Sequence, residues 1–441
     1  MMKTPQEHYR EKICSAEAAA ALIGDGSNLM VSMGVSMPPA LLHAIADRAR
    51  SGSLTNLKAY YMHASAHAGE SILSPDVMQV IKPYSLFMSG YDREIERLGR
   101  LNGQCWMNYV PCTFHQVGRL MTETIGAEAF IATVSPMDRH GYFSLGTNSD
   151  YGTVVARNCG KLIVEVNGSM PRVFGEALIH ISEVDALVEN TCPLLEVLPA
   201  DPGFEDDLIA RQIVEQIPDG ATIQMGVGGV PNAVATYLRG HNDLGLHSEL
   251  LAPGLVDLIR RGVITGKRKT LHRLKHLFTL ALGDRKMYEF MDDNPSLAGY
   301  PASYINDPGI IAQNANMISV NSALQVDLTG QINAEYLQGK EFSGPGGQLD
   351  FVRGAYASRG GKSFIALHST AKNGSLSRIV PQLDGPATDP RMDTHHVVTE
   401  YGMVNLKGLS LNERAQALIS LAHPDFREAL GEAAVTRGLV S

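Results

Sequence analysis

The sequence is poor in cysteine for its length. Its 441 residues include five cysteines, Cys14, Cys105, Cys112, Cys159 and Cys192, and no two are spaced as Cys-x-x-Cys. An odd, sparse set of this kind argues against a disulfide framework and favours a reducing compartment. Thiols in such a chain most often serve as small buried apolar side chains.

The chain also has fewer basic than acidic residues. The chain has 37 Lys and Arg against 46 Asp and Glu, which gives a net charge of −9. A protein whose main partner is nucleic acid needs a basic surface, so this class is excluded. A small anionic ligand remains possible, because backbone N–H groups and a few cations can bind it locally.

Long apolar runs are absent as well. No run approaches the roughly 18 residues of a membrane helix, and the charged residues 1–14 contain no apolar core of a secretory signal. Apolar residues make up 44% and charged residues 19%, a composition typical of globular proteins. We therefore expect a cytoplasmic protein of two or three domains that binds neither membrane nor nucleic acid.

The most informative feature that is present is an internal repeat. A turn, a short apolar run and a glycine-bearing loop ending in proline occur at residues 24–39 and again at residues 218–231. Proline is favoured in the first turn of a helix, so helices are expected over residues 40–50 and 232–239. Two copies of strand, loop and helix indicate duplicated α/β halves.

Further short apolar runs fit this arrangement. They are expected to be strands covered on both faces, and they lie at residues 130–134, 161–166, 186–188 and 364–367. Asp201-Pro202-Gly203 marks a loop before a helical stretch at 204–216. The sequence thus predicts an α/β protein with two similar mixed α/β domains, residues 1–200 and 204–441, facing each other across a cleft.

Three segments could carry chemistry. The first is the loop Gly226-Val227-Gly228-Gly229-Val230, whose free N–H groups could face an anion at the start of a helix. It lacks the third glycine of a dinucleotide fingerprint, because Asn232 stands there, and no P-loop lysine follows. A tight structural turn without ligand is an equally good interpretation of the loop alone.

The second and third segments are a carboxylate and a glycine turn. Glu249 follows an apolar stretch and should lie at the end of a strand, where it could be a base, a metal ligand or a nucleophile. It could equally cap a loop or pair with a Lys or Arg, without a function. The turn Ser343-Gly344-Pro345-Gly346-Gly347 precedes an amphipathic helix and could form an oxyanion hole or a simple connection.

Other candidate sites are weaker. His63 and His67 are spaced by four residues but lack the glutamate of His-Glu-x-x-His, and His395-His396 has no third ligand nearby in sequence. We expect no metal site. The basic run at 260–269 fits a solvated face better than a phosphate site, and no Gly-x-Ser-x-Gly elbow indicates a serine hydrolase.

Taken together, these motifs resemble the acetyl-CoA hydrolase/transferase family, and most closely its 4-hydroxybutyrate and butyrate CoA-transferase branch. The order is the glycine loop, then His247-Ser248-Glu249, then residues 343–351. The resemblance covers nearly the whole chain, with further matching segments at residues 138–146, 165–172, 262–265, 321–327, 369–372, 398–402 and 422–427. The pattern is also similar to itaconate CoA-transferases of pathogenic bacteria.

The resemblance implies the functional residues. It implies that Glu249 becomes a CoA thioester and that the oxyanion is met by the Gly347 N–H and the Asn321 amide. It also implies that CoA, a substrate and no permanently bound cofactor, contacts Gly347, Lys372 and the loop residues Gly226, Val227, Gly228, Gly229 and Val230. A homo-oligomer, dimeric or larger, is expected from the family.

Two departures from the family pattern concern ligand contacts. Arg273-Leu274-Lys275 replaces the usual Pro-Gly-Lys, and the segment 104–111, which could line the acyl pocket, differs from the butyrate branch. An acyl-CoA hydrolase on the same scaffold is the main alternative function. A dinucleotide-dependent oxidoreductase is a weaker one, because its glycine fingerprint is incomplete.

Overall fold

A computed structural model describes residues 3–198, 201–226 and 228–440. Their contacts form two compact units, the first comprising Met1–Val197 and Leu277–Ile305, the second Leu198–His276 and Asn306–Ser441. The sequence predicted two continuous segments, 1–200 and 204–441. The structure differs at 277–305, a stretch that includes helix α11 (Arg285–Met291) and belongs to the first unit.

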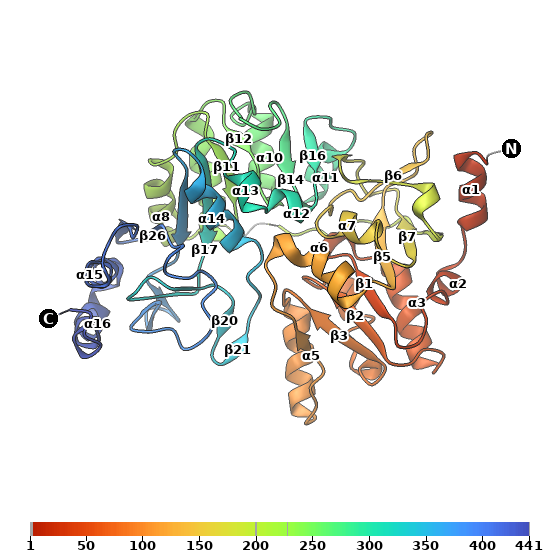
Figure 1. Ribbon diagram of the computed structural model, residues 1–441, viewed down its shortest axis with the longest axis horizontal. Helices are drawn as coiled ribbons and strands as arrows, with labels where there is room; N and C mark the ends of the chain where they lie inside the picture. The colour runs from red at the N-terminus through yellow and green to blue at the C-terminus, as the bar shows by residue number, and fades with distance from the viewer. Residues whose placement is uncertain (1–2, 199–200, 227, 441) are drawn as a thin grey trace. The chain divides into compact units, whose positions relative to one another are not determined.

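A parallel sheet of seven strands organises the first unit (Figure 1). Every neighbouring pair in it is parallel. In spatial order the strands are β10 (Ala186–Glu189), β7 (Leu162–Val166), β5 (Ala129–Val134), β1 (Asn28–Val31), β2 (Leu57–Tyr61), β3 (Ile81–Ser85) and β4 (Asn108–Tyr109).

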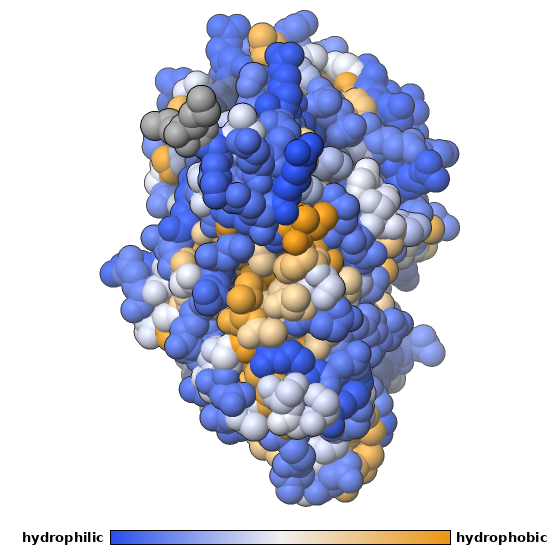
Figure 2. Space-filling model, turned by 90° about the vertical axis from the view of Figure 1, so that its right-hand side faces the viewer, coloured by the Kyte–Doolittle hydropathy of each residue, from blue (hydrophilic) through white to orange (hydrophobic). Residues whose placement is uncertain are grey.

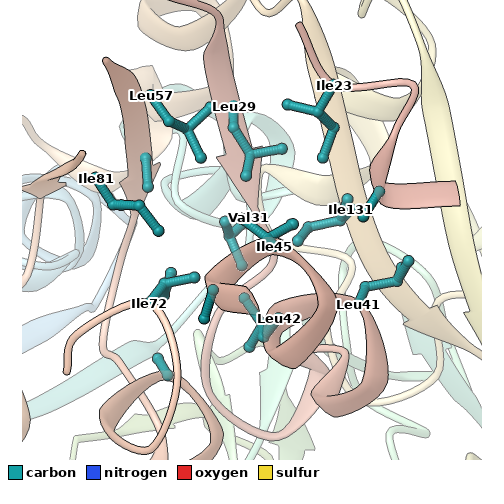
Figure 3. Close-up of a cluster of buried hydrophobic side chains, with 14 of the residues drawn as sticks. Ile23, Leu29, Val31, Leu41, Leu42, Ile45, Leu57, Ile72, Ile81 and Ile131 are labelled. Carbon is teal, nitrogen blue, oxygen red and sulfur yellow. The ribbon is translucent and has the colours of Figure 1, made fainter. Parts of the chain in front are cut away.

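Apolar side chains from these strands and from helix α3 (Pro39–Arg50) form a core cluster of the first unit. Figure 3 shows them converging: Leu29, Val31, Leu57, Ile81 and Ile131 from the strands, and Leu41, Leu42 and Ile45 from the helix. All eight are fully buried. Each contributes about 1.5–3 kcal/mol of transfer free energy, so this packing holds α3 against the sheet.

The second unit is built on a six-stranded sheet (Figure 1). Helices α8 (Phe204–Val214) and α14 (Gln348–Ala357) pack against it. Only its last strand pair is antiparallel. In spatial order the strands are β12 (Gly245–Leu246), β11 (Thr222–Met225), β17 (Met317–Ser322), β22 (Lys362–Ala366), β26 (His396–Thr399) and β27 (Gly402–Asn405).

The two sheets share a topology. The order β10-β7-β5-β1-β2 in the first unit matches β26-β22-β17-β11-β12 in the second, and in both the chain visits the strands in the same sequence. The repeat found in the sequence corresponds to β1 with α3 and to β11 with α9 (Gly229–Tyr237). The predicted pair of similar α/β halves is therefore confirmed, and α9 starts three residues earlier than expected.

The face shown in Figure 2 is mostly hydrophilic, and apolar residues gather on it in a strip surrounded by polar ones. Two apolar side chains of the N-terminal segment, Ile13 and Leu22, are 40% and 39% exposed. No helix in the described part of the chain combines the length and the hydropathy that a membrane span requires.

Candidate active site

The predicted site residues of the second unit gather at one edge of its sheet. Strands β12, β11 and β17 are neighbours and run parallel. Glu249 follows β12 by three residues, Gly226 directly follows β11, and Asn321 is the fifth of six residues in β17. Ligands of parallel α/β sheets bind at the carboxyl ends of the strands, which is where these residues lie.

Two donors hold the Glu249 carboxylate. The Asn306 side chain donates from Nδ2 to Oε2 at 2.6 Å, and the backbone N–H of Gly347 donates to the same carboxylate. The residue before it, Ser248, is buried and accepts at Oγ from the N–H of Met225 at 3.4 Å. The end of β11 therefore fixes the direction in which the chain presents Glu249.

Gly347 has to be glycine because of its neighbours, not because of its backbone angles. Its φ of −103° is accessible to any residue. A Cβ atom there would overlap with Glu249 Oε2 and with Asn306 Nδ2. Gly347 is also the N-cap of α14, so the free N–H groups and positive dipole end of that helix lie beside the carboxylate.

The environment of Glu249 opposes its ionisation. Burial raises the pKa of the carboxyl to about 7, and the charge of Asp350 adds to the rise, while the donors Asn306 and Gly347 act in the opposite direction. A buried carboxyl with a raised pKa beside a charged neighbour is a candidate functional group. The protonation state of Glu249 therefore responds to small changes of pH near neutrality.

This raised pKa predicts a pH-dependent cost in stability. Glu249 ionises at 4.5 in a reference peptide and at about 7 in the fold, so the folded state binds the proton more tightly. Stability relative to a Glu249→Gln variant, which cannot titrate, therefore falls as pH rises from 4.5 to 7 and is constant above. The expected change is about 3 kcal/mol.

Chemical denaturation of both proteins at pH 4.5 and pH 8.5 measures this change. The absolute difference at one pH is not the test, because glutamine also replaces one carboxylate oxygen by an amide NH2 group and so changes the hydrogen bonding at the site. Only the growth of the difference with pH reports Glu249, since all other titrating groups are shared. An equal difference at both pH values would show that the Glu249 pKa is not raised.

The glycine loop lies one strand away from Glu249. Val227 is outside the described residues; Gly226 donates its N–H to Val320 O at 2.9 Å, and Gly228 has a φ of 131°, which favours glycine. A Cβ atom on Gly229 would overlap with the carboxylate of Asp206, a residue of α8. The predicted anion-binding end of α9 thus has an internal carboxylate beside it.

The equivalent helix of the first unit shows the same arrangement. Leu41 in the first turn of α3 donates its N–H to Glu165 Oε2 at 3.0 Å, and Glu165 is fully buried. Asp206 differs, because its Oδ1 also pairs with His368 Nε2 at 2.8 Å and its side chain is 13% exposed. A partly exposed carboxylate can be displaced by a ligand more easily than a fully buried one.

Asn321 and Lys372 are placed differently from each other. Asn321 is buried next to Gly226, and its amide exchanges two hydrogen bonds with the Gln224 amide, at 3.0 and 3.2 Å. Lys372 is exposed in the turn between β23 (Thr370–Ala371) and β24 (Leu376–Ser377), with a φ of 50°. The structure brings Glu249, Gly347, Gly226 and Asn321 to the same sheet edge and gives Lys372 no contact with them among the described residues.

Two residues that contact Glu249 or the strand before it had no signal in the sequence. Asn306 precedes an Asp-Pro pair and resembles an ordinary turn residue. Lys269 belongs to the basic run, yet it is 3% exposed and donates from Nζ to Leu246 O at 2.8 Å and to Lys275 O at 2.9 Å. Its stem occupies the space that a side chain on Gly245 would need, and burial lowers its pKa to about 7.

The histidine pairs form no metal centre in the part of the chain that the structure describes, where no three His, Cys, Asp or Glu side chains cluster suitably. His395 and His396 instead pack their rings 4.0 Å apart, against Tyr356 and Phe364. Burial lowers both pKa values, to about 3 and about 4.

Comparison with known families gives two matches along the chain. The N-terminal domain of acetyl-CoA hydrolase/transferase matches residues 1–199, and the C-terminal domain of acetyl-CoA hydrolase/transferase matches residues 283–434. The second match contains Asn306, Asn321, Gly347 and Lys372. Glu249 lies in the stretch between the two matches.

Full-length relatives agree with these matches. The 4-hydroxybutyrate coenzyme A transferase of Clostridium kluyveri is 39% identical over 429 residues, covering 96% of this chain and 97% of that protein. The succinyl-CoA:cyclohexane-1-carboxylate CoA transferase of Geobacter metallireducens is 39% identical over 433 residues, covering 97% and 96%. The crystal structure of RipA from Yersinia pestis superposes with a TM-score of 0.97 at 52% identity, covering 99% and 100%.

Proposed function

Because the chain belongs to the acetyl-CoA hydrolase/transferase family, we propose that it transfers coenzyme A between an acyl-CoA and a small carboxylic acid, with Glu249 as the covalent carrier. One observation supports this most directly. The Glu249 carboxylate accepts from the Gly347 N–H and from Asn306 at the carboxyl edge of the sheet. These donors are already placed where a reaction on that carboxylate would need them.

In the proposed reaction, a Glu249 oxygen attacks the acyl-CoA carbonyl, and the C–S bond breaks to give a mixed anhydride and CoA thiolate. The thiolate then attacks the glutamyl carbonyl, which forms a glutamyl-CoA thioester and releases the first acid. A second acid reverses both steps and leaves as its CoA ester. Covalent catalysis of this type conserves the thioester energy and predicts ping-pong kinetics.

Each step passes through an oxyanion. We assign the Gly347 N–H and the Asn321 amide as its donors, and one such donor is worth about 3–4 kcal/mol. Asn306 is a further candidate donor, because its Nδ2 is at hydrogen-bond distance from Oε2. We assign CoA contacts to Gly226, Val227, Gly228, Gly229, Val230, Gly347 and Lys372.

The substrate acid is proposed from the relatives. Their acids, 4-hydroxybutyrate and cyclohexane-1-carboxylate, are small monocarboxylates, and succinyl-CoA is one of the CoA donors. We propose an acid of this size, with itaconate or succinate as the dicarboxylic candidates. A methylene changes affinity by only about 1–3 kcal/mol, so several acids should react at different rates.

We also propose a cytoplasmic homo-oligomer that holds no permanent cofactor. The lack of a cysteine framework supports the compartment. The apolar strip in Figure 2 supports an oligomer, because exposed apolar surface of this kind is often covered by a second copy.

An acid panel tests the function. Acetyl-CoA or succinyl-CoA is supplied as donor with acetate, butyrate, 4-hydroxybutyrate, succinate or itaconate, and the new CoA ester is measured. We expect new esters, with free CoA released much more slowly. Release of free CoA at the same rate without an acceptor acid would favour the hydrolase. Binding of NAD without binding of acetyl-CoA would favour an oxidoreductase.

A further inference from the structure

A buried acid lies next to the glycine turn and has no part in the proposed chemistry. Asp389 is fully buried, and its Oδ2 accepts from Gln348 Nε2 at 2.7 Å. Its other carboxyl oxygen, Oδ1, is buried and has no hydrogen-bond partner among the residues that the structure describes. A buried carboxyl with one oxygen unpaired costs stability, which indicates that something other than stability maintains it.

Gln348 connects this acid to Glu249. It is the first residue of α14 and directly follows Gly347, whose N–H donates to the Glu249 carboxylate. Among the hydrogen bonds described, Asp389 is linked to the glycine turn only through the Gln348 side chain. A shift of Gln348 would therefore move the Gly347 N–H away from Glu249.

The other end of the turn is attached to the same support. Phe342 and Ser343 both donate their N–H groups to Glu335 O, at 2.7 and 3.2 Å. Thr388 Oγ1 accepts from the Ala334 N–H and donates to Glu335 Oε1, each at 2.9 Å. Residues 332–335 and 388–389 thus form one support, which binds the turn at Ser343 and at Gln348.

The charges around Asp389 favour its neutral form. Glu335 and Asp393 are acidic neighbours, and the opposing cation Arg353 is paired with Asp393 at 3.0 Å. Burial is the larger influence and raises the pKa of Asp389 to about 7. Asparagine therefore imitates much of what the native side chain does near neutral pH, since it offers the same acceptor oxygen without a charge.

We propose that Asp389 is a positioning residue for the Glu249 reaction: through Gln348 it holds the turn that presents the Gly347 N–H to the reacting carboxylate. The proposal rests on the proposed function. It makes Asp389 and Gln348 a pair whose loss acts mainly on the chemical steps. Acyl-CoA binding should change little, because the other CoA contacts assigned above, at residues 226–230 and at Lys372, do not involve this turn. Neither residue touches the reacting atoms in this account.

Four variants test the proposal: Asp389→Ala, Asp389→Asn, Gln348→Ala and, as a matched control, Gln212→Ala. Gln212 also links a helix to a neighbouring segment, because its side chain donates to Thr399 O at 3.0 Å. It serves as the control because it lies on α8 and not at the start of α14. We expect Asp389→Ala and Gln348→Ala to lower kcat about 10- to 100-fold, with KM for acyl-CoA within about 3-fold. Asp389→Asn and Gln212→Ala should keep kcat within about 3-fold.

The outcomes separate this proposal from the proposed function. If wild-type protein neither transfers CoA nor becomes labelled at Glu249 by borohydride in the presence of acyl-CoA, the proposed function fails. If the wild type reacts and Gln348→Ala keeps full kcat, the positioning role of the pair is refuted. An Asp389→Asn variant as slow as Asp389→Ala would also refute the positioning role. If Asp389→Ala does not fold, the kcat of Gln348→Ala tests that role instead.

Discussion

Replacing Glu249 by alanine is expected to lower CoA transfer at least about 10⁴-fold, because no other group can carry the acyl and CoA bonds in turn. The side chain lies in a loop between two short strands, so the fold should persist without it. Glu249 contacts only Asn306 and Gly347 among the hydrogen bonds described. Circular dichroism and initial-rate measurements on the purified variant check both statements.

A trapping experiment identifies the covalent bond itself. Borohydride should reduce a glutamyl thioester to the alcohol, so mass spectrometry should find Glu249 modified in wild-type protein treated with acyl-CoA and borohydride together. Borohydride alone, and the alanine variant with both reagents, serve as controls. Full activity in the alanine variant, or modification of another residue, would mean that Glu249 is not the carrier.

Replacing Gly347 by alanine is expected to lower kcat about 100- to 1,000-fold, the range found when one oxyanion donor is lost. The added Cβ overlaps with both Glu249 Oε2 and Asn306 Nδ2, so the carboxylate and the turn must separate. The backbone at Gly347 is not strained by alanine, since its φ is −103°. We therefore expect the loss to appear in the rate and only weakly in the melting temperature.

Gly431→Ala is the matched control for this variant. Gly431 lies within helix α16 (Pro424–Thr436), and a Cβ there meets nothing within 4 Å. The same chemical change should leave kcat unchanged and slightly raise stability, because alanine favours helices over glycine. If Gly347→Ala were as active as this control, the close approach of the turn to Glu249 would have no catalytic role.

The repeat and the Glu249 region could be predicted because their signals are local. The loop at 33–39 and the loop at 225–231 carry glycine and proline at the same relative positions, and each lies between a strand and a helix. Several glycines in a short turn before a helix, as before α14, likewise indicate that the backbone there lies close to other groups. These features depend on residues that are neighbours in the chain, so they can be interpreted without coordinates.

The contacts that shape the site could not be predicted in the same way. Asn306 meets Glu249 from 57 positions away, and Gln348 meets Asp389 from 41 positions away. Each residue looks like an ordinary turn or helix residue in its own segment. The chain's return to the first unit over residues 277–305 is hidden for the same reason, because no composition change marks it.

The amino-acid sequence by itself determined the two α/β halves, the family, and the candidates Glu249 and Gly347, because strand–loop–helix signals are short-range. Only the tertiary structure decided which groups touch the Glu249 carboxylate, that Gly347 must lack a side chain, and that Asp206 lies against Gly229. Those facts depend on where the sheet places distant segments side by side, and burial then sets the pKa of each group at that edge.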